Sequence, residues 1–182
     1  DLGYANYNKT FRELLMIPSL KWRKATERRR LKSITAETDE KTVTVTVQHR
    51  VPLCRGTAVT VYSIDGEGNI LIRHTVRPKR EMVRVGLTMG VSPSLGNVTW
   101  YGRGPHENYS DRKAGAPIGL YSFSAEEMPH SYVRPQENGT RSDVRWMMLH
   151  DSSGNGVRVT GKTFGFSVWP YTQENLQNAQ HR

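Results

Sequence analysis

Hydrophobic and polar residues alternate along much of this chain, which is the period-two pattern of β-strands with one buried face. Residues 42–51 read TVTVTVQHRV, with valines on one side and threonine, glutamine and arginine side chains on the other. Two similar runs span residues 58–64 and 70–76, and the sequence DGEGN lies between them. Its glycines permit the positive φ angles of a tight turn. These segments therefore predict consecutive antiparallel strands joined by hairpins.

The rest of the pattern predicts more strands and little helix. Helix is expected only at residues 9–16, which end before Pro18, and at residues 172–179, where Thr172 is the N-cap. The sequence DSSGNG and a corner at Gly161–Lys162 are expected to form turns. Further strands are expected at residues 82–91, 97–102, 143–150, 156–161 and 164–168. Many strands with hairpin turns predict an all-β fold, a large antiparallel two-sheet sandwich.

Residues 103–142 interrupt this pattern with prolines, glycines and only short apolar stretches, and we call this segment the excursion. A long irregular segment inside a β domain is usually functional or an ordered wrap closed by its own side chains. We expect residues 1–182 to form a single domain. Its parts are an entry segment at 1–30, antiparallel strands at 31–102, the excursion, and strands with a short C-terminal helix at 143–182.

The composition limits the classes of protein that the chain can belong to. Apolar residues make up 36% of its 182 residues, which is sufficient for a hydrophobic core. The single cysteine, Cys54, allows neither an internal disulfide nor a zinc site built from cysteines, and it leaves the compartment undecided. Because no apolar run approaches the roughly 20 residues of a membrane span, we expect no membrane partner.

A net charge of +9 raises nucleic acid as a partner, and the densest basic run is KWRKATERRRLK at residues 21–32. Such a cluster could bind phosphates, and Trp22 could stack on a base. The alternative is a solvated strand and turn. Because no recognition helix or RNA-binding motif accompanies the cluster, we favour the solvated surface and expect no nucleic-acid partner.

Two segments carry the residue types of a sugar-cleaving site: WYGRGPHENYSDR at residues 100–112 and RPQENGTR at residues 134–141. Both contain Pro-x-Glu-Asn, so Glu107 and Glu137 are candidates for the two carboxyl groups, about 5 Å apart, of a retaining glycosidase. The alternative is that the motifs satisfy loop backbone that has no strand partner. A carboxylate in such a turn typically accepts backbone N–H bonds and stays ionised, so it supplies no acid. We therefore favour the structural role.

Other candidate residues are weaker. His106 and His130 lie near carboxylates but lack the spacing of a dedicated metal site, so no metal ligand is expected. Trp100 and Trp146 fall in phase with apolar neighbours, Val98 for the first and Val144 and Met148 for the second, which predicts core packing. Trp169, followed by Pro170, is the better candidate for an exposed ring that stacks on a sugar.

The stretch WYGRGPHENYSDRKAGAPIGLY resembles a segment of the C-terminal small-chain domain of bacterial β-galactosidases of glycoside hydrolase family 2. YVRPQENGTRSDVRW resembles a second segment of that domain, and DLG followed by KWRKA, and FSVWPYTQENLQNAQHR, resemble two more in the expected order. The residues that match the two central motifs, to which we assign structural roles, are Trp100, Gly102, Gly104, Pro105, Glu107, Asn108, Tyr109, Asp111, Arg112, Pro135, Glu137, Asn138, Gly139 and Arg141.

This resemblance implies a galactose-mutarotase-like supersandwich that is C-terminally incomplete, since the family's domain continues through several more strands. In the family, the nucleophile and the acid/base are glutamates of a (β/α)₈ barrel that precedes this domain. The resemblance therefore implies no catalytic residue and no metal ligand in this chain, because Mg²⁺ and Na⁺ are bound mainly by the barrel. Asp1 and Gly3 match a stretch near the barrel mouth, and they are expected to lie close to the substrate.

The implied function is that of a non-catalytic part of a retaining β-galactosidase, which hydrolyses terminal β-D-galactosides such as lactose. The domain would buttress the barrel and shape its pocket. Its partners would be the rest of the polypeptide, the galactoside and further copies of the enzyme, in the bacterial cytoplasm or periplasm. Two alternatives stay open. One is a stand-alone carbohydrate-binding β-sandwich that uses the excursion and an exposed aromatic ring, and the other is a basic nucleic-acid-binding module.

Overall fold

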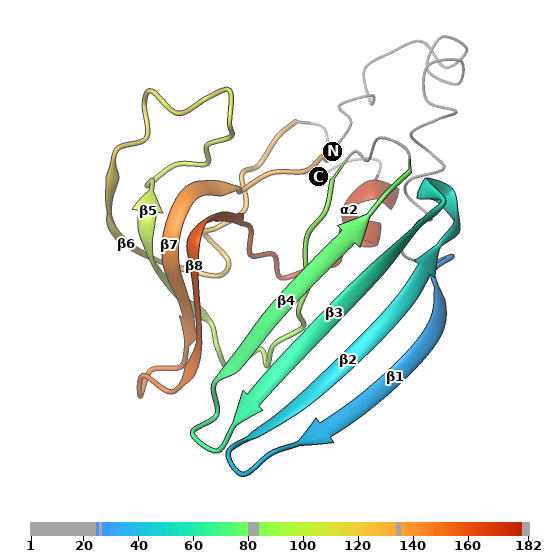
Figure 1. Cartoon of the computed structure of the whole chain (residues 1–182). Coiled ribbons are helices and arrows are strands. Elements are labelled where there is room, and N and C mark those ends of the chain that lie inside the picture. The colour runs from blue at the N-terminus through green and yellow to red at the C-terminus, as the bar shows by residue number, and fades with distance from the viewer. Residues whose placement is uncertain (1–24, 26, 80–83, 134–135, 180–182) are drawn as a thin grey trace, which may run out of the picture. The chain divides into compact units, whose positions relative to one another are not determined.

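The structure is a computed structural model, which describes residues 25, 27–79, 84–133 and 136–179. It is all-β, with two antiparallel sheets of four strands each and almost no helix, as the sequence predicts. The chain divides into two compact units. One contains strands β1–β4, and the other contains β5–β8 and the short helix α2 (Figure 1).

The first unit is a meander with strand order β1-β2-β3-β4. Its strands are β1 (Arg30–Thr38), β2 (Thr42–Val51), β3 (Gly56–Asp65) and β4 (Ile70–Arg77), and a single 3₁₀ turn, η2 (Pro52–Cys54), links β2 to β3. The predicted hairpins are confirmed. Asp39 accepts the Lys41 and Thr42 N–H groups in the first turn, and Asp65 accepts the Glu67 and Asn69 N–H groups in the third.

The faces of the first sheet follow the alternation in β2. Val47 pairs with Ile34 on one side and with Thr60 on the other, and Val45 lies between Ala36 and Tyr62 in the next row. The buried hydrophobic residues described in this unit form a small cluster near one end of the sheet, where Val51, Cys54 and Ala58 pack against Val76.

The second unit contains the larger core. Its sheet has the order β6-β5-β7-β8, so β5 and β7 occupy the centre. The strands are β5 (Asn97–Arg103), β6 (Ile118–Ser124), β7 (Arg141–His150) and β8 (Gly156–Phe166). The indole of Trp100 is fully buried, as predicted, and lies within 6 Å, centroid to centroid, of the rings of Tyr121, Phe123 and Phe166. Val98, Met128, Val144, Met147 and Leu149 complete this core.

The prediction for β7 is wrong in its phase. Val144 is buried, but Trp146 and Met148 are not, and Met147 and Leu149 are buried in their place. The pairing of β7 with β8 shifts between Val144 and Trp146, and such an irregularity moves all later side chains to the opposite face. Trp146 therefore packs under the guanidinium of Arg158, 4.9 Å from its ring centroid.

Three other predictions about strands need correction. Residues 84–91, the described part of the expected strand at 82–91, form no strand, because alternation alone supplies no ladder partner and Gly86 and Gly90 weaken an extended segment. The strands expected at 156–161 and 164–168 are one strand, β8, in which the Gly161–Lys162 corner is a bulge between Thr160 and Phe164. The excursion is also less irregular than predicted, because it contains β6.

The helix expected at 172–179 is confirmed as α2 (Gln173–Asn178), and the Thr172 hydroxyl accepts the Asn175 N–H at 3.1 Å. The helix expected at residues 9–16 lies outside the described residues. Within the described ranges, no helix has the length and apolar character that crossing a membrane would require.

Candidate functional site

The first Pro-x-Glu-Asn motif begins where β5 leaves the sheet, and close contacts with the core fix that point. The Trp100 indole N–H donates to the carbonyl of Arg103 at 3.0 Å, so the buried ring also holds the turn of the chain. Gly102 lies against Val144, where a Cβ atom would come within 2.7 Å of the Val144 Cα. Any side chain at this position would push β5 away from β7. The Gly104–Pro105 peptide, which follows, is cis.

Glu107 joins three segments of the chain through one carboxylate. Its Oε2 accepts the backbone N–H of Gly139 at 2.8 Å, and its Oε1 accepts a guanidinium N–H of Arg112 at 3.2 Å and the hydroxyl of Tyr132. Only 8% of its side chain is exposed. Gly139 has a φ of 73°, a left-handed conformation that favours glycine, and this orients its N–H toward the carboxylate.

These contacts determine the charge of Glu107. Burial by itself raises the pKa of its carboxyl group, but the hydrogen bonds from Tyr132, Gly139 and Arg112 outweigh burial, and the pKa lies below its ordinary value. A general acid needs the opposite shift. Glu107 is thus an ionised acceptor whose two oxygens are both occupied by protein donors.

Asn108 is fully buried and replaces the ladder partners that the excursion lacks. Its Oδ1 accepts both the backbone N–H and the hydroxyl of Ser142, and its Nδ2 donates to the carbonyl of His106 at 2.9 Å. Its own backbone N–H donates to the carbonyl of Thr140 at 2.7 Å. The side chain therefore ties the first motif to the start of β7.

Asn138, in the second motif, repeats this arrangement. It is 3% exposed, its Oδ1 accepts the backbone N–H of His130 at 2.9 Å, and its Nδ2 donates to the carbonyl of Gln136 at 2.8 Å. In both motifs the amide donates to the carbonyl two residues earlier and accepts an N–H from a more distant segment. The similarity of the two sequences is therefore also a similarity of hydrogen bonding.

Arg141 connects the two motifs through backbone carbonyls. It is 5% exposed, and its guanidinium donates to the carbonyls of Pro105, Met128 and Gly139 at 3.2, 3.0 and 2.8 Å. Its Cζ lies 5.4 Å from the centroid of the Trp100 ring. Burial lowers the pKa of the guanidinium, and the nearby charge of Glu107 opposes that shift. The buried cation is thus stabilised by carbonyl dipoles, an aromatic face and the carboxylate of Glu107.

A cluster of ion pairs that the sequence did not predict ties the first part of the excursion to β7. Asp143 accepts Arg103 Nε at 2.7 Å and Lys113 Nζ at 2.8 Å, and Arg103 also donates to the carbonyls of Lys113 and Ala116. Asp143 has a φ of 50°, a conformation that aspartate tolerates better than most residues. The sequence around Asp143 carries no signal for this role, because its partners lie 30 and 40 residues away.

The remaining candidate residues surround this network. Tyr109 pairs with Arg112 in an isolated bridge, and the Arg112 guanidinium lies 5.0 Å from the centroid of its ring. Burial raises the pKa of Tyr109, and the nearby charges of Glu107 and Glu137 add to that shift. Asp111 is exposed. Asp1, Gly3, Trp22 and Pro135 lie outside the described residues.

The structure offers no arrangement of metal ligands in the part of the chain that it describes. His106 and His130 are both exposed, and His130 packs edge-on against Tyr132 with 4.5 Å between ring centroids. No three His, Cys, Asp or Glu side chains of the described residues come together in a way that could hold a metal ion.

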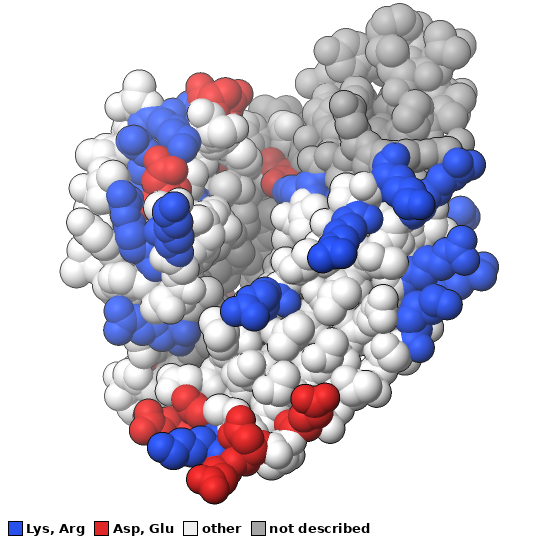
Figure 2. Space-filling view, viewed as in Figure 1, with Lys and Arg blue, Asp and Glu red and all other residues white. Residues whose placement is uncertain are grey.

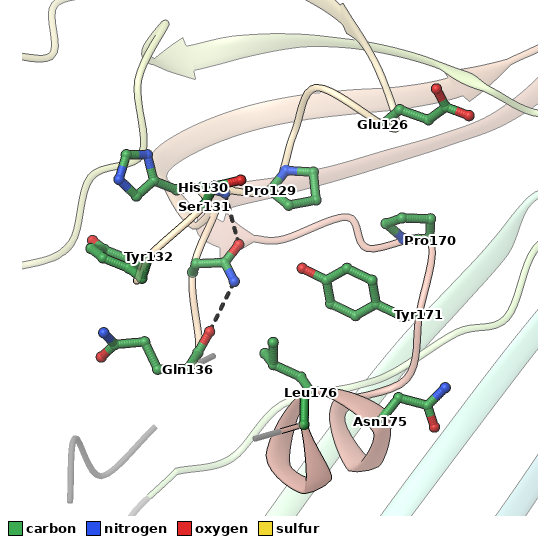
Figure 3. A pocket seen from close by; sticks show the side chains of 12 residues that line it. Glu126, Pro129, His130, Ser131, Tyr132, Gln136, Pro170, Tyr171, Asn175 and Leu176 are labelled. Atoms are coloured by element: carbon green, nitrogen blue, oxygen red, sulfur yellow. Dashed lines mark hydrogen bonds between the residues drawn. The ribbon is translucent and has the colours of Figure 1, made fainter. Parts of the chain in front are cut away.

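A pocket of about 480 Å³ opens beside the second motif (Figure 3). One wall comes from excursion residues between 126 and 132 and at 136 and 138, and the other comes from residues 170–179. Trp169, expected to be exposed, is half-buried, and its indole N–H donates to the carbonyl of Asn138 at 3.1 Å. The lining residues are Glu126, Pro129, His130, Ser131, Tyr132, Gln136, Asn138, Pro170, Tyr171, Asn175, Leu176 and Ala179.

Charge on the first sheet separates toward its two ends. Lys and Arg gather at the end where β1 begins, and Asp and Glu gather at the opposite end (Figure 2). Strand pairing explains this separation, since Arg30 lies opposite Arg50 and Arg77 lies in the same row two strands further on, whereas Asp39 and Asp65 occupy turns at the far end. The part of the basic run at residues 21–24 and 26 lies outside the described residues.

The fold and the buried network define an all-β domain in which residues typical of a sugar-cleaving site serve as hydrogen-bond partners of the backbone. A family model described as "Beta galactosidase small chain" matches residues 9–182, and the chain belongs to this family. It is 30% identical to a β-galactosidase of Priestia megaterium and 32% identical to one of Lactobacillus delbrueckii subsp. bulgaricus, in each case over 88% of this chain.

Both relatives are much longer proteins. The chain spans 16% of the length of each, and it covers 9% of a Vibrio cholerae β-galactosidase to which it is 40% identical over 98 residues. The chain therefore corresponds to one part of a larger enzyme in these relatives.

The amide of Asn108 provides a direct test of the structural role. Asn108→Leu keeps the approximate volume but leaves the Ser142 N–H and the His106 carbonyl without their partner. Each buried group that loses its hydrogen bond costs about 1–3 kcal/mol, so urea unfolding should show a clear loss of stability. The same change at the exposed Asn155, Asn155→Leu, should have little effect. Equal shifts in the two variants would contradict a structural role for Asn108.

The charge of Glu107 predicts a pH dependence of stability. Because its folded-state pKa lies below the unfolded value of about 4.3, its contribution is present above that value and is lost as the pH falls through the lower, folded-state pKa. Glu107→Gln should therefore destabilise the protein at pH 7, and the difference from the native protein should shrink as the pH falls below about 4. Urea unfolding at several pH values measures this, with the exposed Glu67→Gln as the control. A difference that stays constant with pH would show that ionised Glu107 is not a stabilising group.

Proposed function

We propose that this chain is a non-catalytic part of a retaining β-galactosidase that hydrolyses terminal β-D-galactosides such as lactose. Its β-sheets would buttress the catalytic barrel of the same polypeptide and shape one wall of the substrate pocket. The observation that carries this proposal is the state of Glu107. It is ionised, nearly buried and fully engaged by Tyr132, Arg112 and Gly139, so the best acid candidate in the chain already acts as a structural acceptor.

The family and the length of the relatives support the same proposal. Proteins that carry this domain as 16% of their length have ample chain elsewhere for a catalytic domain. The described residues do not fit a site for Mg²⁺, which prefers octahedral oxygen ligands, because they bring no suitable group of side chains together. We therefore assign the Mg²⁺ and Na⁺ ions of the family's enzymes to the barrel. We also propose that the complete enzyme is a homo-oligomer, and this part of the proposal is supported by the family resemblance.

A carbohydrate-binding module is the second candidate, and the pocket beside Asn138 favours it. This pocket combines apolar and polar side chains, and the excursion forms one of its walls, as the sequence-based alternative requires. A nucleic-acid module has weaker support. One end of the first sheet is basic, but none of the described elements is a recognition helix that could enter a groove of DNA. The other end of the same sheet is acidic.

The purified 182-residue chain should not cleave nitrophenyl β-galactoside above the buffer background, because both catalytic carboxyl groups are assigned to the barrel. A complete β-galactosidase assayed in parallel provides the positive control. Turnover by the chain that disappeared in Glu107→Gln or Glu137→Gln would overturn the proposal.

The same glutamate can be tested in the whole polypeptide. There, Glu107→Gln should lower Tm while kcat stays within about two-fold, whereas loss of a catalytic group typically costs 10⁴-fold or more. A fall in kcat of that size at unchanged Tm would place Glu107 in the catalytic machinery and contradict its structural assignment.

A further inference from the structure

The described residues that line the pocket beside the second motif all belong to the unit that contains β5–β8. The pocket's volume of about 480 Å³ lies within the range of 300–1,000 Å³ that is usual for small-molecule sites. The two walls are distant in sequence, with lining residues between 126 and 132 and at 136 and 138 in one, and between 170 and 179 in the other. Neither Glu107 nor Arg141 lines the pocket, whereas Asn138 belongs both to its wall and to the buried network.

An aromatic ring forms the centre of one wall. Figure 3 shows the ring of Tyr171 and the side chain of Leu176 directed toward the opposite wall, where Pro129 and Gln136 lie. The Tyr171 ring is nearly parallel to that of Trp169, at 12° and 6.4 Å between centroids. Trp169 is itself fixed by its hydrogen bond to the carbonyl of Asn138. The orientation of Tyr171 is thus set by protein contacts before any ligand arrives.

The opposite wall is also held in place. The Asn138 amide bonds the backbone of His130 on one side and that of Gln136 on the other, and both of these residues line the pocket. A preformed cavity loses less conformational entropy on binding than one that must be ordered by its ligand. The buried asparagine therefore shapes this site as well as the fold.

Polar groups with unused hydrogen-bonding capacity surround the rings. Within the part of the chain that the structure describes, no hydrogen bond engages the side chains of Glu126, Ser131 or Gln136, or the Nδ2 of Asn175, whose Oδ1 accepts from Thr172. Amide and hydroxyl groups both donate to and accept from alcohols, and an ionised carboxylate accepts from them. The pocket therefore offers an apolar surface with several free polar groups beside it.

The charged side chains among the residues that line the pocket indicate which class of ligand it could bind. None of the described residues that line the pocket is Lys or Arg, and one of them, Glu126, is acidic, so these residues offer no cation to a phosphate or another anion. The many polar groups disfavour a lipid. A neutral pyranose ring matches both features, because it has an apolar C–H face and a rim of hydroxyl groups.

We propose that this pocket binds a neutral pyranoside, with the C–H face of one sugar ring on Tyr171 and its hydroxyl groups bonded by Gln136 and Asn175. No bond of the sugar is broken here, so the site differs from the hydrolytic function proposed above and stands whether or not that function is correct. Leu176 and Pro129 would exclude water from the edge of the stacked ring.

Ligand-observed NMR titration of the purified chain with galactose, lactose and methyl β-glucoside tests this proposal. At least one of these sugars should show saturable binding. Tyr171→Ala should weaken that binding about ten-fold or more, which corresponds to about 1.4 kcal/mol. Tyr171→Phe, which keeps the ring, should bind within about two-fold of the native chain. Tyr101→Ala removes an exposed ring on β5 outside the pocket, so it should leave binding unchanged.

Two further measurements keep the proposal falsifiable. If Tyr171→Ala does not fold, as judged by circular dichroism, then Gln136→Ala decides instead, with an expected loss of about five-fold. Inorganic phosphate should neither bind the pocket nor displace the sugar. Absence of saturable binding by all three sugars, equal affinity in the native chain and the decisive variant, or displacement of the sugar by phosphate would overturn the proposal.

Discussion

The part of the chain between β5 and β7 depends on one constraint, which is that its buried backbone groups must find hydrogen-bond partners outside a β-ladder. Asn108 and Asn138 supply several of these partners, and each amide bonds one local carbonyl and one N–H from a distant segment. Arg141 binds three further carbonyls, and Glu107 binds the N–H of Gly139. The charges of Arg141 and Glu107 lie in the same network, so each reduces the cost of burying the other.

This constraint explains why the motifs resemble a catalytic site without having the properties of one. Catalysis of glycoside hydrolysis needs a carboxyl group that holds a proton near neutral pH and has room for a substrate beside it. Glu107 has neither property, because its hydrogen bonds lower its pKa and its oxygens face protein donors. The same asparagine that satisfies the backbone also fixes one wall of the pocket that faces Tyr171. A structural residue thus also shapes a cavity.

Local pattern was sufficient to predict the first sheet, since the alternation in β2 and the glycine-containing turn after β3 are determined by residues close in sequence. It failed wherever pairing between distant strands decides the outcome. The register shift beside Val144 reversed the expected faces of Trp146 and Met148. The bulge at Gly161 lets the two strands expected at 156–161 and 164–168 continue as the single strand β8. Of the site, the sequence identified Glu107, Asn108, Asn138 and Arg141 through their motifs. Asp143 and Tyr171 were missed, because their roles depend on partners that only the folded chain brings together.

Hydrogen exchange of individual amides tests most directly whether side chains replace a β-ladder in the excursion. The N–H groups of Gly139 and Ser142 donate to the side chains of Glu107 and Asn108. If these side chains are constant structural partners, both amides should exchange as slowly as the paired amides of β5, and Glu107→Gln and Asn108→Leu should accelerate exchange at Gly139 and Ser142 respectively. Exchange of both amides in the native chain at the rate of an unstructured peptide would contradict the account.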